Sequence, residues 1–311
     1  MPDTATATDY RKYLDPRVLA RVGALDIRAR RIVEGLMTGM HRSPLQGISV
    51  EFAQHRQYVT GDDPRHVDWK VFGKTDKIYL KQYLQETNLQ LVCVVDASES
   101  MAYSSVGEGD ARWSKYDHAT AIAAALSYLV IQQQDSAGLA IFDQDLRQYL
   151  KPSNSPTQWK AITRELTLTP RLRKTNTAKV LDQLAEKLRQ RSVVLILSDF
   201  FDDLDNLKKG LRHLRHKKHE AIVFQILDPA EIDFPFDETT MFKGLEGAGE
   251  LLTDPRALKA GYQAELAAFT DQLRKLCRGM NADFARMNSG DPLDVALSGF
   301  LAGRAASIQS T

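Results

Sequence analysis

With 311 residues, the chain is long enough for one large domain or two ordinary ones, and for a sizeable hydrophobic core. Its 41 Lys and Arg residues are balanced by 40 Asp and Glu residues, and the net charge of +1 excludes a strong overall field that would attract nucleic acid or a membrane surface. The only cysteines, Cys93 and Cys277, form neither a disulfide framework nor a CxxC metal motif, which fits a reducing compartment.

The sequence contains no pattern typical of a secretory signal or of a membrane-spanning helix. The N-terminus, MPDTATATDYRKYL, lacks the apolar core of a signal peptide. The longest nearly apolar stretch, 119–131, is shorter than the ~20 residues that a bilayer-spanning helix needs. We therefore expect a cytoplasmic protein with no membrane span and with no nucleic acid among its partners.

Asp-Pro pairs mark the expected starts of several helices. Asp accepts hydrogen bonds from the free N–H groups at a helix start, and Pro suits the first helical position because its missing N–H has no partner there. The pair occurs five times, and four of these precede a helix-like pattern, namely those that begin at Asp15, Asp63, Asp254 and Asp291. The helix after Asp63 is expected to carry Val67 and a buried Trp69.

From residue 89 onward, strand and helix patterns alternate along the chain. The first strand pattern, in LVCVVDASESM, is a continuous apolar run of the kind found in the centre of a parallel sheet. The alternation predicts an α/β fold with a mainly parallel sheet and helices on both faces, and one antiparallel edge strand at 146–150. The remaining strand patterns lie at 138–142, 193–197, 221–227 and 281–287, with a hairpin at 239–245 and 249–253. Helical patterns lie at 116–134, 156–166, 177–190, 203–218 and 256–278.

The turn after the first apolar strand carries the most distinctive chemistry of the chain. Its sequence DASES offers the carboxylate of Asp96 and the hydroxyls of Ser98 and Ser100 at a strand end, where open α/β sheets place their ligand sites. Asp199 follows the second fully apolar strand in the same way, and Thr175 stands where a loop meets a helix start. Mg²⁺ prefers oxygen ligands in near-octahedral geometry. These five residues are therefore the predicted ligands of Mg²⁺ or Mn²⁺.

Together, DASES, the TNT loop and LSD resemble the metal-ion-dependent adhesion site (MIDAS) of von Willebrand factor A domains. The pattern there is DxSxS, then Thr, then Asp, and all five positions carry the expected residue type. The resemblance implies an A-like (Rossmann-like) fold, a bound divalent cation and an open position that takes a Glu or Asp from a partner. Phe200 departs from the pattern, because many such domains have Gly after the second Asp, and this concerns the shape of the loop.

Similarity to domain-of-unknown-function family fifty-eight extends over roughly Gly47 to Arg304. It is carried by the block GISVEFAQHRQYVTGDDPRHVDWKVFGKTDKIYLKQYLQET and continues through FPFDETTMFKGLEG, LLTDPRALKAGY and DPLDVALSGFLAGR. Proteins of this family are commonly encoded beside MoxR-type AAA+ ATPases, which implies such an ATPase as a partner. Many also carry N-terminal transmembrane helices, which are not expected here.

The same resemblance sets the expected domain organisation. We expect an N-terminal family-specific region at 1–88, with a helix and short strand patterns at 48–52 and 78–85. It is followed by an A-like domain at 89–311, with a β-hairpin and helix insertion at about 229–280.

The residues and the resemblance together favour a non-enzymatic, metal-dependent protein-interaction module. It would act as a partner or adaptor of a MoxR-type AAA+ ATPase in protein assembly or maturation, and would dock a partner's carboxylate on the MIDAS-bound Mg²⁺.

The alternative is a metal-dependent hydrolase or phosphotransferase that uses Asp96. Phosphotransferases of the haloacid dehalogenase type have a nucleophilic Asp at this strand end and a second Asp two residues later, where this chain has Ser98. A hydrolase would also need a general base near the metal, for which Asp143, Asp202 and Asp203 are the nearby candidates.

Overall fold

The computed structural model of the chain describes residues 50–58, 67–75, 77–85, 89–109, 112–167, 177–243, 249–293, 296–297 and 300. The described residues fall into two compact units, one made by the segments between 50 and 85 and one that begins at Leu89. The helix predicted after Asp15, the predicted cap Asp63 and the predicted ligand Thr175 lie outside the described residues. The domain boundaries given above stay a prediction.

The first unit is a two-stranded antiparallel sheet with one short helix in the connection. Strand β1 (Val50–Gln57) pairs with β2 (Tyr79–Gln85), and helix α2 (Trp69–Thr75) lies between them in the chain. The strand pattern at 78–85 is thereby confirmed, while β1 extends further than the predicted 48–52. A break in the register between Phe52 and Gln54 interrupts the pairing.

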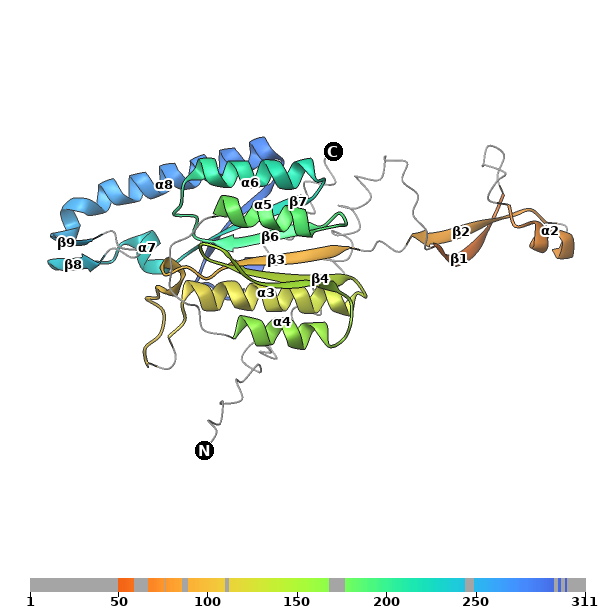
Figure 1. The fold of residues 1–311 in the computed structure, drawn as a ribbon, viewed down its shortest axis with the longest axis horizontal. Helices are drawn as coiled ribbons and strands as arrows, with labels where there is room; N and C mark the ends of the chain where they lie inside the picture. The colour runs from red at the N-terminus through yellow and green to blue at the C-terminus, as the bar shows by residue number, and fades with distance from the viewer. Residues whose placement is uncertain are drawn as a thin grey trace, which may run out of the picture. The chain divides into compact units, whose positions relative to one another are not determined.

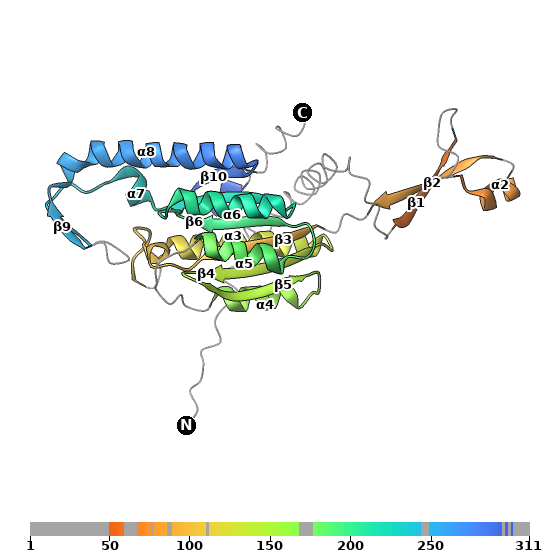
Figure 2. The same cartoon turned by 45° about the horizontal axis from the view of Figure 1, so that its top comes forward.

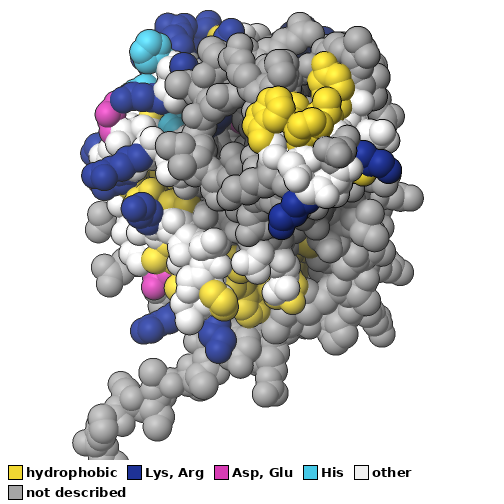
Figure 3. Space-filling model, turned by 90° about the vertical axis from the view of Figure 1, so that its right-hand side faces the viewer, with side chains coloured by type: hydrophobic (Ala, Val, Ile, Leu, Met, Phe, Trp, Pro, Cys, Tyr) yellow, Lys and Arg dark blue, Asp and Glu magenta, His cyan; other side chains and the backbone are white. Residues whose placement is uncertain are grey.

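Two expectations for the helix after Asp63 are wrong. Helix α2 begins at Trp69, after Val67, and the carboxylate of Asp68 accepts a backbone hydrogen bond of 3.3 Å in its first turn. Trp69 is 64% exposed rather than buried, and its ring meets Phe72 edge-on with centroids 6.1 Å apart. In the space-filling view of Figure 3, hydrophobic side chains are exposed at several places, and Lys and Arg side chains lie near them.

The second unit is built on a six-stranded sheet with the strand order β10-β7-β6-β3-β4-β5. All neighbouring strands are parallel except β5, which pairs antiparallel with β4 at the edge. This topology confirms the predicted fold class, an α/β von Willebrand factor A-like fold with a mainly parallel sheet. The strands are β3 (Gln90–Asp96), β4 (Ser136–Phe142), β5 (Leu146–Ser153), β6 (Val193–Ser198), β7 (Glu220–Leu227) and β10 (Asp283–Asn288).

Helices cover both faces of the sheet, as Figures 1 and 2 show. Helices α3 (Lys115–Gln132) and α4 (Gln158–Leu166) lie on one face. Helices α5 (Thr177–Lys187), α6 (Leu204–His216) and α8 (Pro255–Met280) lie on the other. Among the described residues, no helix is long and apolar enough to cross a membrane.

The core under α5, α6 and α8 joins apolar side chains of β3 and β6 to apolar helix faces. Val92 and Val94 of β3 belong to this cluster together with Leu211 of α6 and Leu273 of α8. Helices α5 and α6 approach closely at Gly210, where an added Cβ atom would lie 2.7 Å from the Cβ atom of Leu181. The sheet is thus fixed from this side by close packing.

The Asp-Pro pairs give one confirmed cap and one that the sequence prediction missed. Asp254 caps α8, and its side chain accepts a hydrogen bond from the backbone N–H of Arg256. Asp228, which was not expected to begin a helix, caps the short helix α7 (Pro229–Asp233) and forms a capping box with Glu231. The helix predicted after Asp291 falls mostly outside the described residues.

The strand order places a topological switch point between β3 and β6. From β3 the chain continues through β4 and β5 toward one edge, whereas β6, β7 and β10 lie on the other side of β3. Ligands of open α/β sheets bind at the carboxyl ends of strands at such a point. Helix α7 and the hairpin of β8 (Thr240–Lys243) and β9 (Glu250–Thr253) lie at this end of the sheet in Figure 1.

Candidate functional site

The turn after β3 forms the floor of the site. The backbone N–H of Ser98 donates to Oδ1 of Asp96 at 2.8 Å, which bends the chain back at the end of the strand. Ser198 at the end of β6 donates its hydroxyl to Oδ2 of Asp96 at 2.6 Å. The hydroxyl oxygens of Ser98 and Ser100 lie 3.1 Å apart. The predicted DxSxS residues are therefore brought together at the switch point.

Asp199 lies beside this turn and is bound by a buried lysine. The ammonium nitrogen of Lys115, the first residue of α3, is 2.8 Å from Oδ2 of Asp199 and 2.7 Å from Oε1 of Glu231. The Lys115 side chain has no solvent exposure, and its ammonium lies 5.4 Å from the ring centroid of Phe201. The other carboxylate oxygen of Glu231 accepts the backbone N–H of Asp228 at 2.8 Å. Lys115, Asp199 and Glu231 thus form one buried ion cluster.

Burial and like charges dominate the electrostatics of the site. Burial, reinforced by the neighbouring carboxylate of Asp199, raises the pKa of Asp96 to about 7, although hydrogen bonds from Ser198 and Ser98 oppose this shift. Burial alone would lower the pKa of Lys115, but the carboxylates of Asp199 and Glu231 outweigh it and the pKa is raised. The repulsion between the carboxylates of Asp96 and Asp199 would be relieved by a cation bound at this site.

The described part of the predicted ligand set fits a hard divalent cation. Two carboxylates and two hydroxyls are oxygen donors of the kind that Mg²⁺ takes, and adjacent ligands of its octahedron lie about 3 Å apart, close to the spacing of the two serine hydroxyls. Each carboxylate oxygen of Asp96 accepts one hydrogen bond and keeps a lone pair. Among the described residues, no group of three or more His, Cys, Asp or Glu side chains is placed to hold a metal ion, so a metal at this site would depend on the hydroxyl ligands as well.

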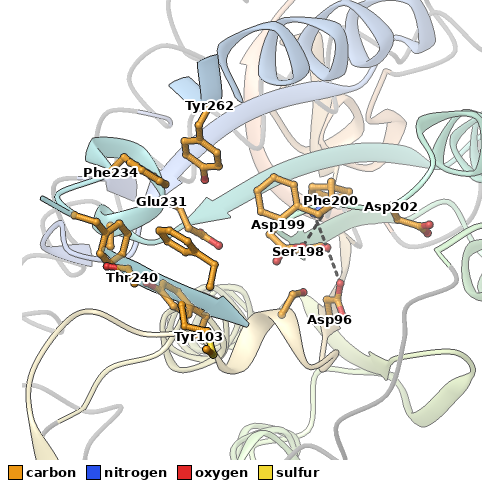
Figure 4. A pocket seen from close by; sticks show the side chains of 16 residues that line it. Asp96, Tyr103, Ser198, Asp199, Phe200, Asp202, Glu231, Phe234, Thr240 and Tyr262 are labelled. Carbon is orange, nitrogen blue, oxygen red and sulfur yellow. Dashed lines mark hydrogen bonds between the residues drawn. The ribbon is translucent and has the colours of Figure 1, made fainter. Parts of the chain in front are cut away.

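A cavity of about 570 Å³ opens over this floor and extends away from it. Asp96, Ser100 and Asp199 lie among its polar lining residues. Its aromatic lining residues come from the segments that follow β6 and α7, from β8 and α8, and from Tyr103. Figure 4 shows Asp96, Ser198 and Phe200 on one side, with Phe234 on the opposite side and the carboxylate of Glu231 between them. The candidate metal ligands therefore share one cavity with an aromatic wall.

Phe200 explains how the loop keeps its shape without glycine. Its φ angle is +60°, in the left-handed region that favours Gly, and its N–H donates to the hydroxyl of Ser198 at 3.0 Å. The side chain is 3% exposed and belongs to the core. Burial of the ring thus offsets a backbone strain of roughly 1–2 kcal/mol.

This strain predicts an unusual order among substitutions at Phe200. Gly and Ala both remove the buried ring, but only Gly removes the strain, so Phe200→Gly should be about 1 kcal/mol more stable than Phe200→Ala. Urea denaturation of both variants measures this difference. Equal stabilities, or a more stable Ala variant, would contradict the strain.

Sequence reasoning missed Lys115, Ser198 and Glu231 as members of the site. Glu231 carries a readable signal, since Asp-Pro-Ala-Glu has the spacing of a capping box at a helix start. Ser198 is the middle residue of the LSD run, where the pattern assigns a ligand role only to Asp199. Lys115 gives no such signal, because a lysine in the first turn of a helix is ordinarily solvated.

The general bases suggested for a hydrolase have other roles in the structure. Asp203 is the N-cap of α6, and Asp143 forms an ion pair with Arg147. Asp202 lines the cavity, and its carboxylate accepts the backbone N–H of Thr177 at 3.4 Å. Of the three, only Asp202 lines the cavity that contains the candidate metal ligands.

Comparison with known proteins identifies relatives over most of the chain. A family model described as "Protein of unknown function DUF58" matches residues 54–271. The chain is 25% identical over 273 residues to uncharacterized protein Rv1480 of Mycobacterium tuberculosis (strain ATCC 25618 / H37Rv), covering 86% of this chain and 84% of that protein. Uncharacterized protein Mb1516 of Mycobacterium bovis matches with the same identity and coverage.

Solved structures with related folds include two from Bacteroides. Conserved hypothetical protein BatB from Bacteroides thetaiotaomicron is 14% identical with a TM-score of 0.46, over 70% of this chain and 99% of that one. An aerotolerance-related membrane protein from Bacteroides fragilis is 11% identical with a TM-score of 0.47, over 72% and 100%. The SpRpn10 VWA domain is 13% identical with a TM-score of 0.36, over 68% and 94%. The fold assignment rests on the strand order and directions given above.

Proposed function

The chain belongs to the family described as protein of unknown function DUF58, and from this premise we propose that it is a non-enzymatic, metal-dependent protein-interaction module. The observation that carries the proposal is that Asp96, Ser100 and Asp199 line one cavity at the switch point, with Ser98 in contact with Asp96 and Ser100. Oxygen donors in this arrangement suit Mg²⁺ or Mn²⁺.

In this proposal, Asp96, Ser98, Ser100, Thr175 and Asp199 hold the metal ion. A metal ion bound there would supply a coordination position for a carboxylate oxygen of another chain. Asp96 and Asp199 contribute carboxylates, but Asp199 already shares its charge with Lys115, and the serines contribute neutral oxygen atoms. The charge of the ion is therefore incompletely compensated by its ligands. Ser198 holds Asp96 in place through its 2.6 Å hydrogen bond.

We further propose a MoxR-type AAA+ ATPase, or a client protein of one, as the partner that supplies the carboxylate. The support is the similarity of the block upstream of β3 to the signature of domain-of-unknown-function family fifty-eight, whose members are commonly encoded beside such ATPases. An adaptor role in protein assembly or maturation follows from such a partnership.

Loss of either predicted carboxylate ligand tests the metal-dependent function. Asp96→Ala and Asp199→Ala are each expected to weaken Mg²⁺ binding by more than the roughly 10–100-fold that outer-sphere changes cost at metal sites. Calorimetric titration with MgCl₂ and MnCl₂ measures this, and affinity capture from native lysate with and without chelator measures partner binding. The exposed helix cap Asp203→Ala is a matched control and should leave both unchanged. If both site variants retain Mg²⁺ binding and partner capture, the proposal is wrong.

A further inference from the structure

The cavity above the candidate metal ligands is larger than a carboxylate requires. Its volume of about 570 Å³ lies within the range of roughly 300–1,000 Å³ that is typical of small-molecule sites. Only one end is formed by Asp96, Ser100 and Asp199, and most of the remaining lining is aromatic. A side chain that reached the polar end would leave the aromatic part of the cavity unfilled.

The aromatic wall is already assembled, because its rings pack on one another. The ring of Phe234 stacks on Phe242 with centroids 5.6 Å apart and lies 4.8 Å from Tyr262. Phe236 meets both Phe234 and Phe242 edge-on, at 5.2 and 5.3 Å. These residues come from the segment that follows α7, from β8 and from α8, so three separate segments converge to build one apolar surface.

The apolar surface continues outside the cavity. Met241 lines it and is 56% exposed, and its cross-strand neighbour Leu252 on β9 is 63% exposed. Phe201, which also lines the cavity, is 46% exposed. Exposed apolar side chains that adjoin an apolar cavity are typical of a surface that another protein covers.

The charges at the polar end limit the chemistry of that partner. Asp96, Asp199 and Glu231 place three largely buried carboxylates against the single ammonium of Lys115. Without a metal ion, this end would repel an acidic ligand. A divalent ion would offset this excess of negative charge, and a partner's carboxylate could then bind the ion beside an apolar group.

We propose that the recognised element is a short peptide segment of the partner in which an Asp or Glu lies next to a large apolar residue, Phe, Tyr, Trp, Leu or Met. The carboxylate occupies the polar end, and the apolar side chain enters the aromatic part of the same cavity. This inference rests on the proposed function and adds the composition of the segment that is bound. Since the two ends belong to one cavity, the two side chains must come from neighbouring positions of the peptide.

The test selects phage-displayed random dodecapeptides on the immobilised full chain in MgCl₂ and, in parallel, in EDTA. We expect peptides enriched only in MgCl₂ to carry Asp or Glu within two positions of a large apolar residue. Acidic peptides without this neighbour would overturn the inference while leaving the proposed function standing. Failure to enrich any peptide in MgCl₂, or enrichment of basic aromatic peptides in both buffers, would also overturn it.

Variants of the apolar rim separate the two parts of the proposal. Met241→Ser and Leu252→Ser should each weaken binding of a selected synthetic peptide by roughly tenfold or more, as loss of an interface anchor does, and should leave Mg²⁺ binding unchanged. Leu258→Ser is the matched control, because Leu258 is 38% exposed on α8 and is not part of the cavity. Full peptide affinity in both rim variants overturns the inference. If the wild-type chain neither bound Mg²⁺ nor preferred acidic peptides, the proposed function itself would be refuted.

Discussion

Replacement of Lys115 by Met is expected to lower the free energy of unfolding by about 3–5 kcal/mol, the usual cost of removing one partner from a buried ion cluster. The Lys115 side chain is fully buried, and its ammonium contacts both Asp199 and Glu231. Met has a similar length but no charge, so both carboxylates would lose their counterion in a dry environment. Urea denaturation with the midpoint and slope fitted separately measures the change.

A lysine of the same chain provides the control for this prediction. Lys179 pairs with Asp145 on the surface, where the lysine side chain is 53% exposed, and such exposed pairs contribute little. Lys179→Met should therefore leave the unfolding midpoint nearly unchanged. Similar midpoints for the two variants would show that the buried cluster does not hold α3 against β6 and α7.

A double variant tests whether the missing charge is the cause. In Lys115→Met/Glu231→Gln, one of the two stranded carboxylates becomes neutral, and stability should exceed that expected from the sum of the two single changes. If the proposed metal site is correct, MgCl₂ should also raise the melting temperature of Lys115→Met more than that of the wild type, because Lys115 no longer competes with Mg²⁺ for Asp199.

The fold was readable from the sequence because the strongest patterns were long and unambiguous. The apolar runs that became β3 and β6 predicted strands buried on both faces, and these strands are neighbours in the sheet. Their adjacency brings Asp96 and Asp199 into the same cavity, as expected from strand ends that meet at one edge. A continuous apolar run of this kind indicates burial on both faces of a strand, so the sequence alone was enough to place these strands in the centre of the sheet.

The parts that the sequence did not predict depend on contacts between distant segments. Lys115 looks like an ordinary first-turn residue, and only the folded chain shows that its side chain runs inward to Asp199, 84 positions away. The aromatic wall gathers residues from α7, β8 and α8 that no local pattern connects. Trp69 illustrates the opposite error, because an aromatic side chain was expected to be buried in a small unit that leaves it exposed.

Asp228 links three segments around the site through one buried carboxylate. The residue has no solvent exposure, and its carboxylate accepts hydrogen bonds from the backbone N–H of Ser105 at 2.8 Å and from the Ser105 hydroxyl. It also accepts the backbone N–H of Ala230 at 2.9 Å, at the start of α7. The capping box therefore holds Glu231, and with it Lys115, in the position seen in the structure.

Asp228→Ala is accordingly expected to destabilise the chain by about 3 kcal/mol or more, since hydrogen bonds to a charged group contribute about 1.5–3 kcal/mol each. The variant should also make the amides of α7 exchange with solvent faster, because the helix loses its cap and its tie to Ser105 together. Denaturant unfolding and hydrogen exchange measure the two effects. Asp254→Ala removes an exposed Asp-Pro cap and should cause a much smaller change, although the residue type, the following proline and the capping bond are the same. Equal losses in the two variants would mean that the cap alone matters, and that the buried link from Asp228 to Ser105 contributes nothing to the site.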